Sequence, residues 1–139
     1  MILLDTNVLS ALMRAEPDAV VLGWIDNQPQ ASIWTTSVTL MEIRYGVQSL
    51  PAGKRRDRIR QAFDAVLREE IQDRFASFDS VAAEQAADLM ARRKSQGRPM
   101  DLRDTMIAAI ALATRATIAT RNVEHFADLD VPIVNPWSA

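Results

Sequence analysis

The chain has 139 residues, of which 48% are hydrophobic and 24% charged, proportions typical of one soluble globular domain. Its formal net charge of −2 excludes a globally basic nucleic-acid binder, so any polyanion must meet local basic patches or bound metal ions. The absence of cysteine excludes disulfides, thiolate zinc sites and cysteine nucleophiles, and a single histidine excludes a histidine-rich metal site.

In the first half of the chain, short apolar strands alternate with amphipathic helices. The strands are predicted at 2–4 and 31–36, and the helices carry apolar residues at 8–13, 20–25, 40–47 and 59–71. The first strand is apolar throughout, which is typical of a strand buried on both faces of a parallel sheet. Ser37 is expected to cap the helix that follows the second strand.

The second half continues the alternation. Strands are predicted at 74–78, 117–120 and 131–134, helices with apolar residues at 81–90 and 106–113, and a short turn or helix at 122–126. Ser80 and Asp101 are expected to cap the two helices, and Gly97 ends the first of them. Strands that alternate with helices form βαβ units, so we expect one α/β domain over 1–139 with a mostly parallel central sheet flanked by helices.

Neither a signal peptide nor a transmembrane segment is visible. The N-terminus lacks a basic stretch followed by a long apolar one, and no uncharged apolar run reaches the roughly 20 residues that span a bilayer. We therefore expect a cytoplasmic protein without membrane contact.

Polar residues follow three of the predicted strands. These are Asp5-Thr6-Asn7, Thr35-Thr36-Ser37 and Thr120-Arg121-Asn122. The carboxyl ends of parallel strands meet at one edge, where open α/β sheets bind their ligands. Glu42 lies about one and a half turns into its helix and can lean back over this edge. Asp104 lies in the first turn of its helix, where the helix dipole favours a carboxylate.

Three carboxylates without histidine or cysteine suit a hard divalent cation such as Mg²⁺ or Mn²⁺, which can activate water for attack on a phosphodiester. Each acid also has a simpler interpretation. Asp5 could simply be a helix cap, and Glu42 could simply form an ion pair with Arg44 or face the solvent. Asp101 and Asp104 could be a cap and a first-turn acid without chemistry. The spacing by itself does not decide between these interpretations.

Five segments resemble, in the same order, the motifs of PIN-domain proteins of the VapC type, the toxin half of bacterial toxin–antitoxin pairs. They are similar to the FitB-like branch in particular. The segments are MILLDTNVLS at 1–10, TSVTLMEIRYG at 36–46, DTMIAA at 104–109, ATRNVEHF at 119–126 and VNPW at 134–137. The resemblance covers nearly the whole chain.

The resemblance implies roles for particular residues. Asp5, Glu42 and Asp104 fall on the family's metal-binding and catalytic acids, Thr6 and Thr120 on supporting hydroxyl positions, and Asn7 on the small polar position beside the first acid. Asn122 stands at the position of the family's fourth acid. An amide oxygen can bind a hard cation but brings no charge, which puts a second metal ion in doubt. Asp101 could partly compensate, although a helix cap remains the better interpretation.

The resemblance further implies an activity and partners. The expected activity is that of an Mg²⁺- or Mn²⁺-dependent endoribonuclease toxin that cuts a structured RNA such as tRNA. The expected partners are a second copy of the chain and a cognate VapB-like antitoxin that contacts DNA for the pair. The apolar residues Leu9, Leu12, Met13, Val47 and Leu50 would suit an antitoxin groove, but ordinary core packing is the safer interpretation of each.

The basic residues have two alternative roles: they could contact RNA, or they could lie on a solvated surface. Arg44 and Arg121 adjoin the predicted acidic edge, where they could balance its charge or hold a phosphate. Basic clusters at 54–60 and 92–98 are either solvated helix faces or RNA-binding patches. For His125 a structural or surface role is favoured over that of a general base.

Two rival functions stay open at this point. The chain could be a catalytically weak partner within a DNA-bound regulatory complex, a hypothesis against which the apparent acidic triad counts. Phosphatase chemistry on a similar sheet ranks lower, because Asp5-Thr6-Asn7 lacks the second acid of an Asp-x-Asp mechanism.

Overall fold

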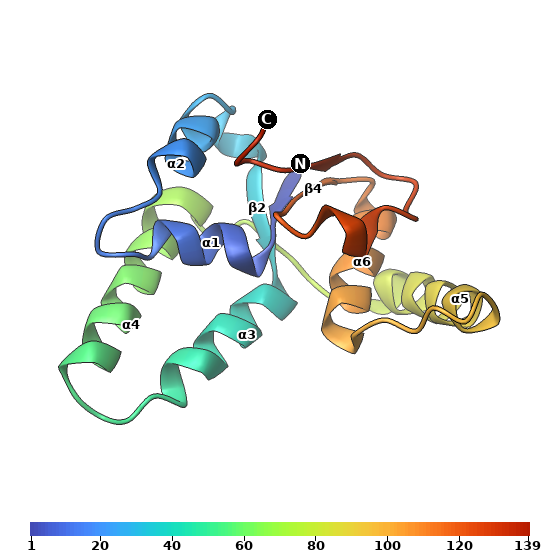
Figure 1. Cartoon of the computed structure of the whole chain (residues 1–139), viewed down its shortest axis with the longest axis horizontal. Helices are drawn as coiled ribbons and strands as arrows, with labels where there is room; N and C mark the ends of the chain where they lie inside the picture. Colours follow the sequence, from blue (N-terminus) through green and yellow to red (C-terminus); the bar gives the residue numbers. More distant parts are fainter.

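The computed structural model describes all 139 residues as strands alternating with helices, as the sequence predicts (Figure 1). The strands are β1 (Ile2–Leu4), β2 (Ile33–Thr36), β3 (Phe75–Ala76), β4 (Thr117–Ala119) and β5 (Ile133–Val134). The α-helices are α1 (Thr6–Leu12), α2 (Ala19–Asp26), α3 (Ser37–Gln48), α4 (Lys54–Val66), α5 (Ser80–Ser95) and α6 (Leu102–Thr114). The shorter helical segments are η1 (Gln30–Ser32), η2 (Leu67–Ile71) and η3 (Val123–Phe126).

The five strands form one sheet in the order β3-β2-β1-β4-β5, and every pairing in it is parallel. The prediction of a mostly parallel sheet is therefore confirmed. In the register of the central strands, Leu4 pairs with Thr35 on one side and with Ala119 on the other. The residues that follow β1, β2 and β4 consequently lie in one row at the carboxyl edge of the sheet.

The sheet is covered on both faces, which explains why β1 is apolar throughout. Leu4 packs into a core cluster with α1, α2, α3 and α4, whereas its neighbour Leu3 packs into a second cluster with α5 and α6. Figure 1 shows these two groups of helices on opposite sides of the strands. Successive side chains of a strand point to opposite faces, so both leucines are buried without contact with water.

Core packing, the safer interpretation, accounts for most of the apolar residues that would also suit an antitoxin groove. Leu9, Leu12 and Val47 are buried members of the α1–α4 core cluster. Met13 and Leu50 are partly buried. For the three buried residues the interpretation as core is confirmed.

Two helix caps differ from the predicted ones by one residue. Thr36, the last residue of β2, caps α3 by accepting a hydrogen bond from the Thr39 backbone N–H at 3.0 Å. Ser37 instead accepts one from the Phe78 N–H at 3.2 Å. Asp79 rather than Ser80 caps α5. A capping residue has extended backbone and lies just outside the helix. Both predicted caps are instead the first residue of the helix, so each predicted helix start is one residue too late.

The edge strands are shorter than predicted. β3 is preceded by Gln72 and Asp73, whose φ angles of 51° and 61° break the extended backbone that a longer strand would need. At the other edge β5 begins after Pro132, a residue that has no N–H to donate to a neighbouring strand. No helix of the structure combines the length and the apolar composition that crossing a membrane requires.

The first prediction concerns the core beside α2, where adjacent valines differ in burial. Val21 is fully buried and Val20 is 57% exposed. Val21→Ala should lower the free energy of unfolding by about 2 kcal/mol, because it removes buried methyl groups and leaves a cavity. Val20→Ala is the matched control and should change it by less than about 0.5 kcal/mol. Urea unfolding monitored by circular dichroism checks both, and equal effects would contradict the assignment of this core.

Candidate active site

Asp5 stands at the carboxyl end of the central strand β1 and is only 5% exposed. One carboxylate oxygen, Oδ1, accepts a hydrogen bond from the Thr6 backbone N–H at 2.8 Å, which makes Asp5 the N-cap of α1. The other, Oδ2, accepts one from the Thr120 hydroxyl at 2.8 Å. The cap predicted as the simpler interpretation is therefore present, and the same carboxylate also lies at the sheet edge where a ligand site was expected.

A network of neutral side chains surrounds Asp5 and connects β1 to the segment after β4. The Asn7 amide donates to Asp5 Oδ2 at 3.4 Å and to Thr120 Oγ1 at 3.3 Å. Asn7 Oδ1 accepts from the Arg121 backbone N–H at 3.1 Å, and Thr120 Oγ1 accepts from the Asn122 N–H at 3.0 Å. The supporting residues predicted for this site thus meet in one hydrogen-bonded cluster.

Glu42 lies on α3 and leans back toward the start of α1. Its Oε1 accepts a hydrogen bond from the Thr6 hydroxyl at 3.3 Å, and its Oε2 lies 3.7 Å from the Arg103 guanidinium. The predicted alternative partner, Arg44, lies elsewhere. Glu42 is 20% exposed, so its carboxylate borders solvent.

Asp104 lies in the first turn of α6, which Asp101 caps as predicted by accepting from the Arg103 and Asp104 backbone N–H groups. Asp104 Oδ2 is 3.1 Å from Nδ1 of His125, the only histidine of the chain. The structural or surface role predicted for His125 therefore does not describe this residue fully, because its ring contacts one of the three candidate acids. The short helical segment predicted at 122–126 is present as η3, but the sequence does not indicate that it brings the His125 ring to Asp104.

The three acids influence one another electrostatically. The pKa of Asp5 is raised above its ordinary value of 3.8, chiefly by burial, with a smaller contribution from the negative charge of Asp104. Burial also raises the pKa of Glu42; the charges of Asp5 and Asp104 add to this effect, and Arg103 opposes it. Asp5 is the most buried of the three and has only neutral hydrogen-bond donors in contact with it.

The carboxylates share one edge of the sheet without forming a tight cluster. No three side chains of the types His, Asp and Glu lie close enough together to hold one metal ion in this arrangement. Glu42 is turned toward Arg103, and Asp104 is turned toward His125. Like charges repel in a buried site, so each of these acids takes a cationic or hydrogen-bonding partner within the chain.

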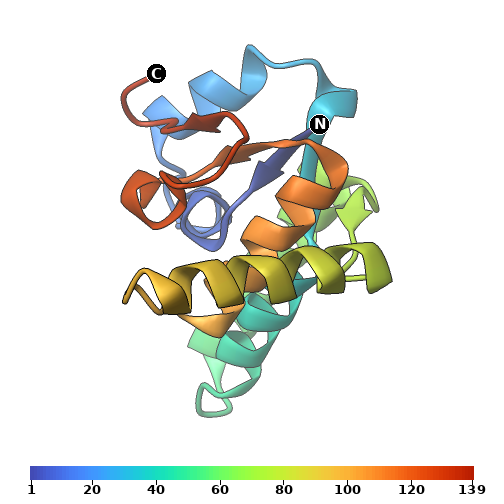
Figure 2. The same cartoon turned by 90° about the vertical axis from the view of Figure 1, so that its right-hand side faces the viewer.

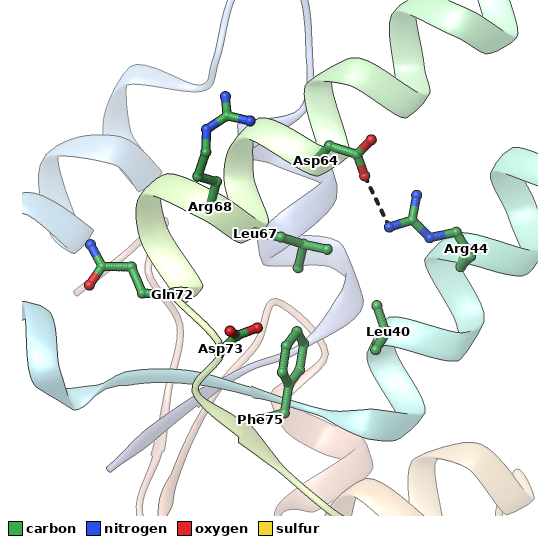
Figure 3. A pocket seen from close by; sticks show the side chains of 8 residues that line it. All are labelled: Leu40, Arg44, Asp64, Leu67, Arg68, Gln72, Asp73 and Phe75. Atoms are coloured by element: carbon green, nitrogen blue, oxygen red, sulfur yellow. Dashed lines mark hydrogen bonds and ion pairs between the residues drawn. The ribbon is translucent and has the colours of Figure 1, made fainter.

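The prediction that Arg44 adjoins the acidic edge is wrong. Arg44 follows Glu42 by two residues, which places it on a different side of α3. Its guanidinium pairs with Asp64 at 3.0 Å and lies 4.8 Å from the centre of the Phe63 ring. The pair lines a separate pocket of about 530 Å³ between α3, α4, η2 and β3. Figure 3 shows the side chains around it. The remaining residues that line it are Leu40, Leu67, Arg68, Gln72, Asp73 and Phe75.

Arg121 and Asn122 adjoin the site through their backbones. The Arg121 guanidinium lies over the Trp137 ring at 3.9 Å from the ring centre, so its charge is held by the C-terminal segment. Asn122 contributes its backbone N–H to Thr120, while its side-chain amide makes no hydrogen bond within the chain. The amide is therefore free to accept or bind another group.

Sequence reasoning missed two arginines near the acids. Arg103 is the cation beside Glu42, and its position next to Asp104 in the sequence was the available signal. Arg93 was assigned to the basic cluster at 92–98, an interpretation that is wrong for this residue, because it is buried with Asp128. Arg93 follows Ala86 and Leu89 at helical spacing, so the apolar face of α5 already indicated its burial.

The raised pKa of Asp5 predicts the pH dependence of stability. A carboxyl group whose pKa is higher in the folded than in the unfolded chain stabilises the fold at low pH, and this contribution is lost as pH rises through the folded-state pKa. Asp5→Asn keeps a capping oxygen and removes the charge. In metal-free buffer we expect it to raise the melting temperature by a few degrees at pH 7 and by much less near pH 4. A gain that is the same at both pH values would contradict this account.

Comparisons with known proteins place the chain in a family. Residues 2–132 match the PIN domain family. The chain is 40% identical over 139 residues to plasmid stability protein StbB of Pseudomonas syringae pv. tomato, covering 100% of both chains. It is 39% identical over 137 residues to VapC ribonuclease Y4jK of Sinorhizobium fredii, covering 99% of this chain and 98% of that one.

A solved structure agrees with these relatives over nearly the whole chain. The structure of FitAB bound to the IR36 DNA fragment matches with a TM-score of 0.87 and 32% identity, covering 99% of this chain and 96% of that chain. The resemblance to VapC-type proteins and to the FitB-like branch, inferred from five short motifs, is thereby confirmed. With its parallel sheet and its row of acids at the carboxyl edge, the chain belongs to the PIN-domain family of nucleases.

Proposed function

We propose that this PIN-domain protein is the endoribonuclease toxin of a toxin–antitoxin pair and that Asp5, Glu42 and Asp104 form its active site. The observation that supports this most is the buried carboxylate of Asp5 at the end of the central strand, within electrostatic reach of the other two acids. Burying a carboxylate costs folding free energy, and carboxyl groups with raised pKa values are concentrated at functional sites. The names of the relatives point to the same nuclease chemistry.

The side chains at this site fit an Mg²⁺ or Mn²⁺ ion by their chemistry. All the candidate ligands are oxygens, and Asp5 holds a buried charge with no cation in direct contact. Asp5 and Asp104 would hold the ion, with Glu42 joining them when it leaves Arg103, and Asn122 could add an uncharged oxygen. A bound ion of this kind supplies activation of water and stabilisation of the charge on a phosphodiester.

The residues of the chain prepare this site in distinct ways. Thr120 and the backbone of Thr6 orient the two oxygens of Asp5, so that the Asp5 side chain needs little reorganisation to bind a metal ion. Burial raises the pKa of Glu42, which brings it closer to the range in which a carboxylate can accept a proton. The exposed guanidinium of Arg103 lies beside Glu42 and can meet a phosphate of the RNA.

The partners follow from the same family assignment. The FitAB structure with a DNA fragment supports the proposal that this chain binds a VapB-like antitoxin, which would make the contacts to DNA. We also propose a homodimer in the cytoplasm, a single PIN domain over 1–139, and a structured RNA such as tRNA as substrate. The exposed part of the basic cluster at 54–60 lies at the start of α4, which follows the C-terminal end of α3 across a short loop (Figure 1).

One observation favours the rival in which the chain is a catalytically weak partner in a regulatory complex. Asn122 replaces the fourth acid, and the three remaining acids do not converge on one point in this arrangement. Cleavage assays separate the two functions, because only the nuclease requires the carboxylates.

The central prediction concerns RNA cleavage by the purified, antitoxin-free protein. With Mg²⁺ or Mn²⁺ we expect discrete cuts in total RNA, and EDTA should abolish them. Asp5→Asn, Glu42→Gln and Asp104→Asn should each lower the rate by more than about 100-fold, beyond the loss caused by removing an outer-shell partner of a metal site. Sequencing of the cut ends then identifies the RNA.

Matched controls lie on the exposed side of α5. Asp88→Asn and Glu84→Gln make the same chemical changes at exposed acids for which the structure gives no hydrogen bond. Both should keep full activity. If the folded wild-type protein cuts no RNA with either metal, or if Asp5→Asn cuts as fast as wild type, the nuclease proposal fails and the regulatory-partner hypothesis takes its place.

A further prediction separates the two roles proposed for Arg103. Arg103→Ala removes the cation that competes with a metal ion for Glu42, so Mn²⁺ should bind about 2–5-fold more tightly, the scale of one exposed ion pair. The same variant should raise the KM for RNA, because a phosphate contact is lost. Calorimetric titration with Mn²⁺ and a cleavage series measure the two effects. Arg55→Ala at the exposed start of α4 is the control for Mn²⁺ affinity, and unchanged Mn²⁺ affinity in Arg103→Ala would refute the competition.

A further inference from the structure

Arg93 is a charged residue in the interior of the fold. It lies on α5 and is only 3% exposed. Its Nε donates to Asp128 Oδ2 at 3.0 Å and its Nη2 donates to Asp128 Oδ1 at 2.9 Å, which makes the pair bidentate. Two further bonds run from Nη2 to the backbone carbonyl of His125 at 3.2 Å and from Nη1 to the Thr105 hydroxyl at 3.4 Å.

This pair remains charged and fixed in its geometry. The guanidinium of Arg93 holds the pKa of Asp128 below its usual range through hydrogen bonds and charge. A planar guanidinium that forks onto one carboxylate has little freedom to rotate. Buried ion pairs contribute little net stability compared with well-packed apolar side chains, so a role in fixing geometry accounts better for this one.

The remaining bonds of Arg93 end beside the active-site acids. Thr105 follows Asp104 in the first turn of α6, and its hydroxyl also donates to the Asp101 carbonyl at 2.9 Å. His125, whose carbonyl accepts from Arg93, carries the ring that lies 3.1 Å from Asp104. Figure 2 shows α5 crossing α6, with η3 beside the end of α5. One guanidinium therefore connects the helix that carries Asp104 to the segment that carries His125.

We infer that Arg93, paired with Asp128, is a positioning residue that sets the His125 ring against the Asp104 carboxylate. The inference rests on the proposed function for its catalytic consequence, because Asp104 is a proposed metal ligand. Its structural content stands independently of that function. Arg93 touches neither the substrate nor a metal ion in this account and acts only through the two segments that it joins.

The single histidine provides a direct test. Protein labelled with ¹⁵N-histidine gives one imidazole spin system, so its NMR signals report the His125 ring alone. Arg93→Lys keeps the charge but loses the fork. We expect it to move the imidazole signals in metal-free protein, to weaken Mn²⁺ binding about tenfold, and to lower kcat for RNA with little change in KM. Arg68→Lys makes the same chemical change at an exposed arginine of η2, which pairs with Glu69, and should change none of these.

The outcomes distinguish this inference from the proposed function. Unchanged imidazole signals in folded Arg93→Lys would overturn the inference, and so would moved signals with wild-type Mn²⁺ affinity and kcat. If wild type neither binds Mn²⁺ nor cuts RNA, the proposed function fails, while the imidazole signals still decide whether Arg93 places the ring. If Arg93→Lys does not fold, Asp128→Asn keeps one acceptor for the guanidinium and is judged by the same measurements.

Discussion

The burial of the Asp5 carboxylate at the end of β1 is the constraint on which the rest of the site depends. An ionised group with 5% exposure is costly to keep away from water, and the chain offsets this cost with hydrogen bonds from Thr6, Asn7 and Thr120. These donors come from opposite ends of the sequence, so the carboxylate holds β1 and the segment after β4 in one arrangement. The parallel pairing of the two strands brings those segments together.

The other two acids show how the fold tolerates negative charge in a small space. Glu42 is partnered by Arg103, and Asp104 by His125, so each takes a group that can carry positive charge, while Asp5 has only neutral donors. A divalent cation would compete most effectively for the carboxylate that lacks such a partner. The negative charge of the site is thus partly compensated by groups of the chain itself.

Beyond these contacts, the arrangement of α5, α6 and η3 decides where the acids can point. Arg93 is buried and connects the three segments by hydrogen bonds. In the sequence it belongs to a basic cluster that could be a solvated surface. Its burial shows that a charged residue in a cationic sequence cluster is not necessarily a surface residue. The face of the helix on which it falls, not its immediate neighbours in sequence, determines its environment.

The sequence by itself determined the alternation of strands and helices, the parallel sheet and the edge at which Asp5, Glu42 and Asp104 gather. These follow from local patterns: apolar runs, helical spacing and polar residues at strand ends. Only the tertiary structure decided that Arg44 turns away to Asp64, that His125 reaches Asp104 and that Asp128 is the partner of the buried Arg93. Long side chains find their partners across segments far apart in the chain, and such pairings leave no periodic signal in the sequence. The directions in which these side chains point are set by how the helices pack on the sheet.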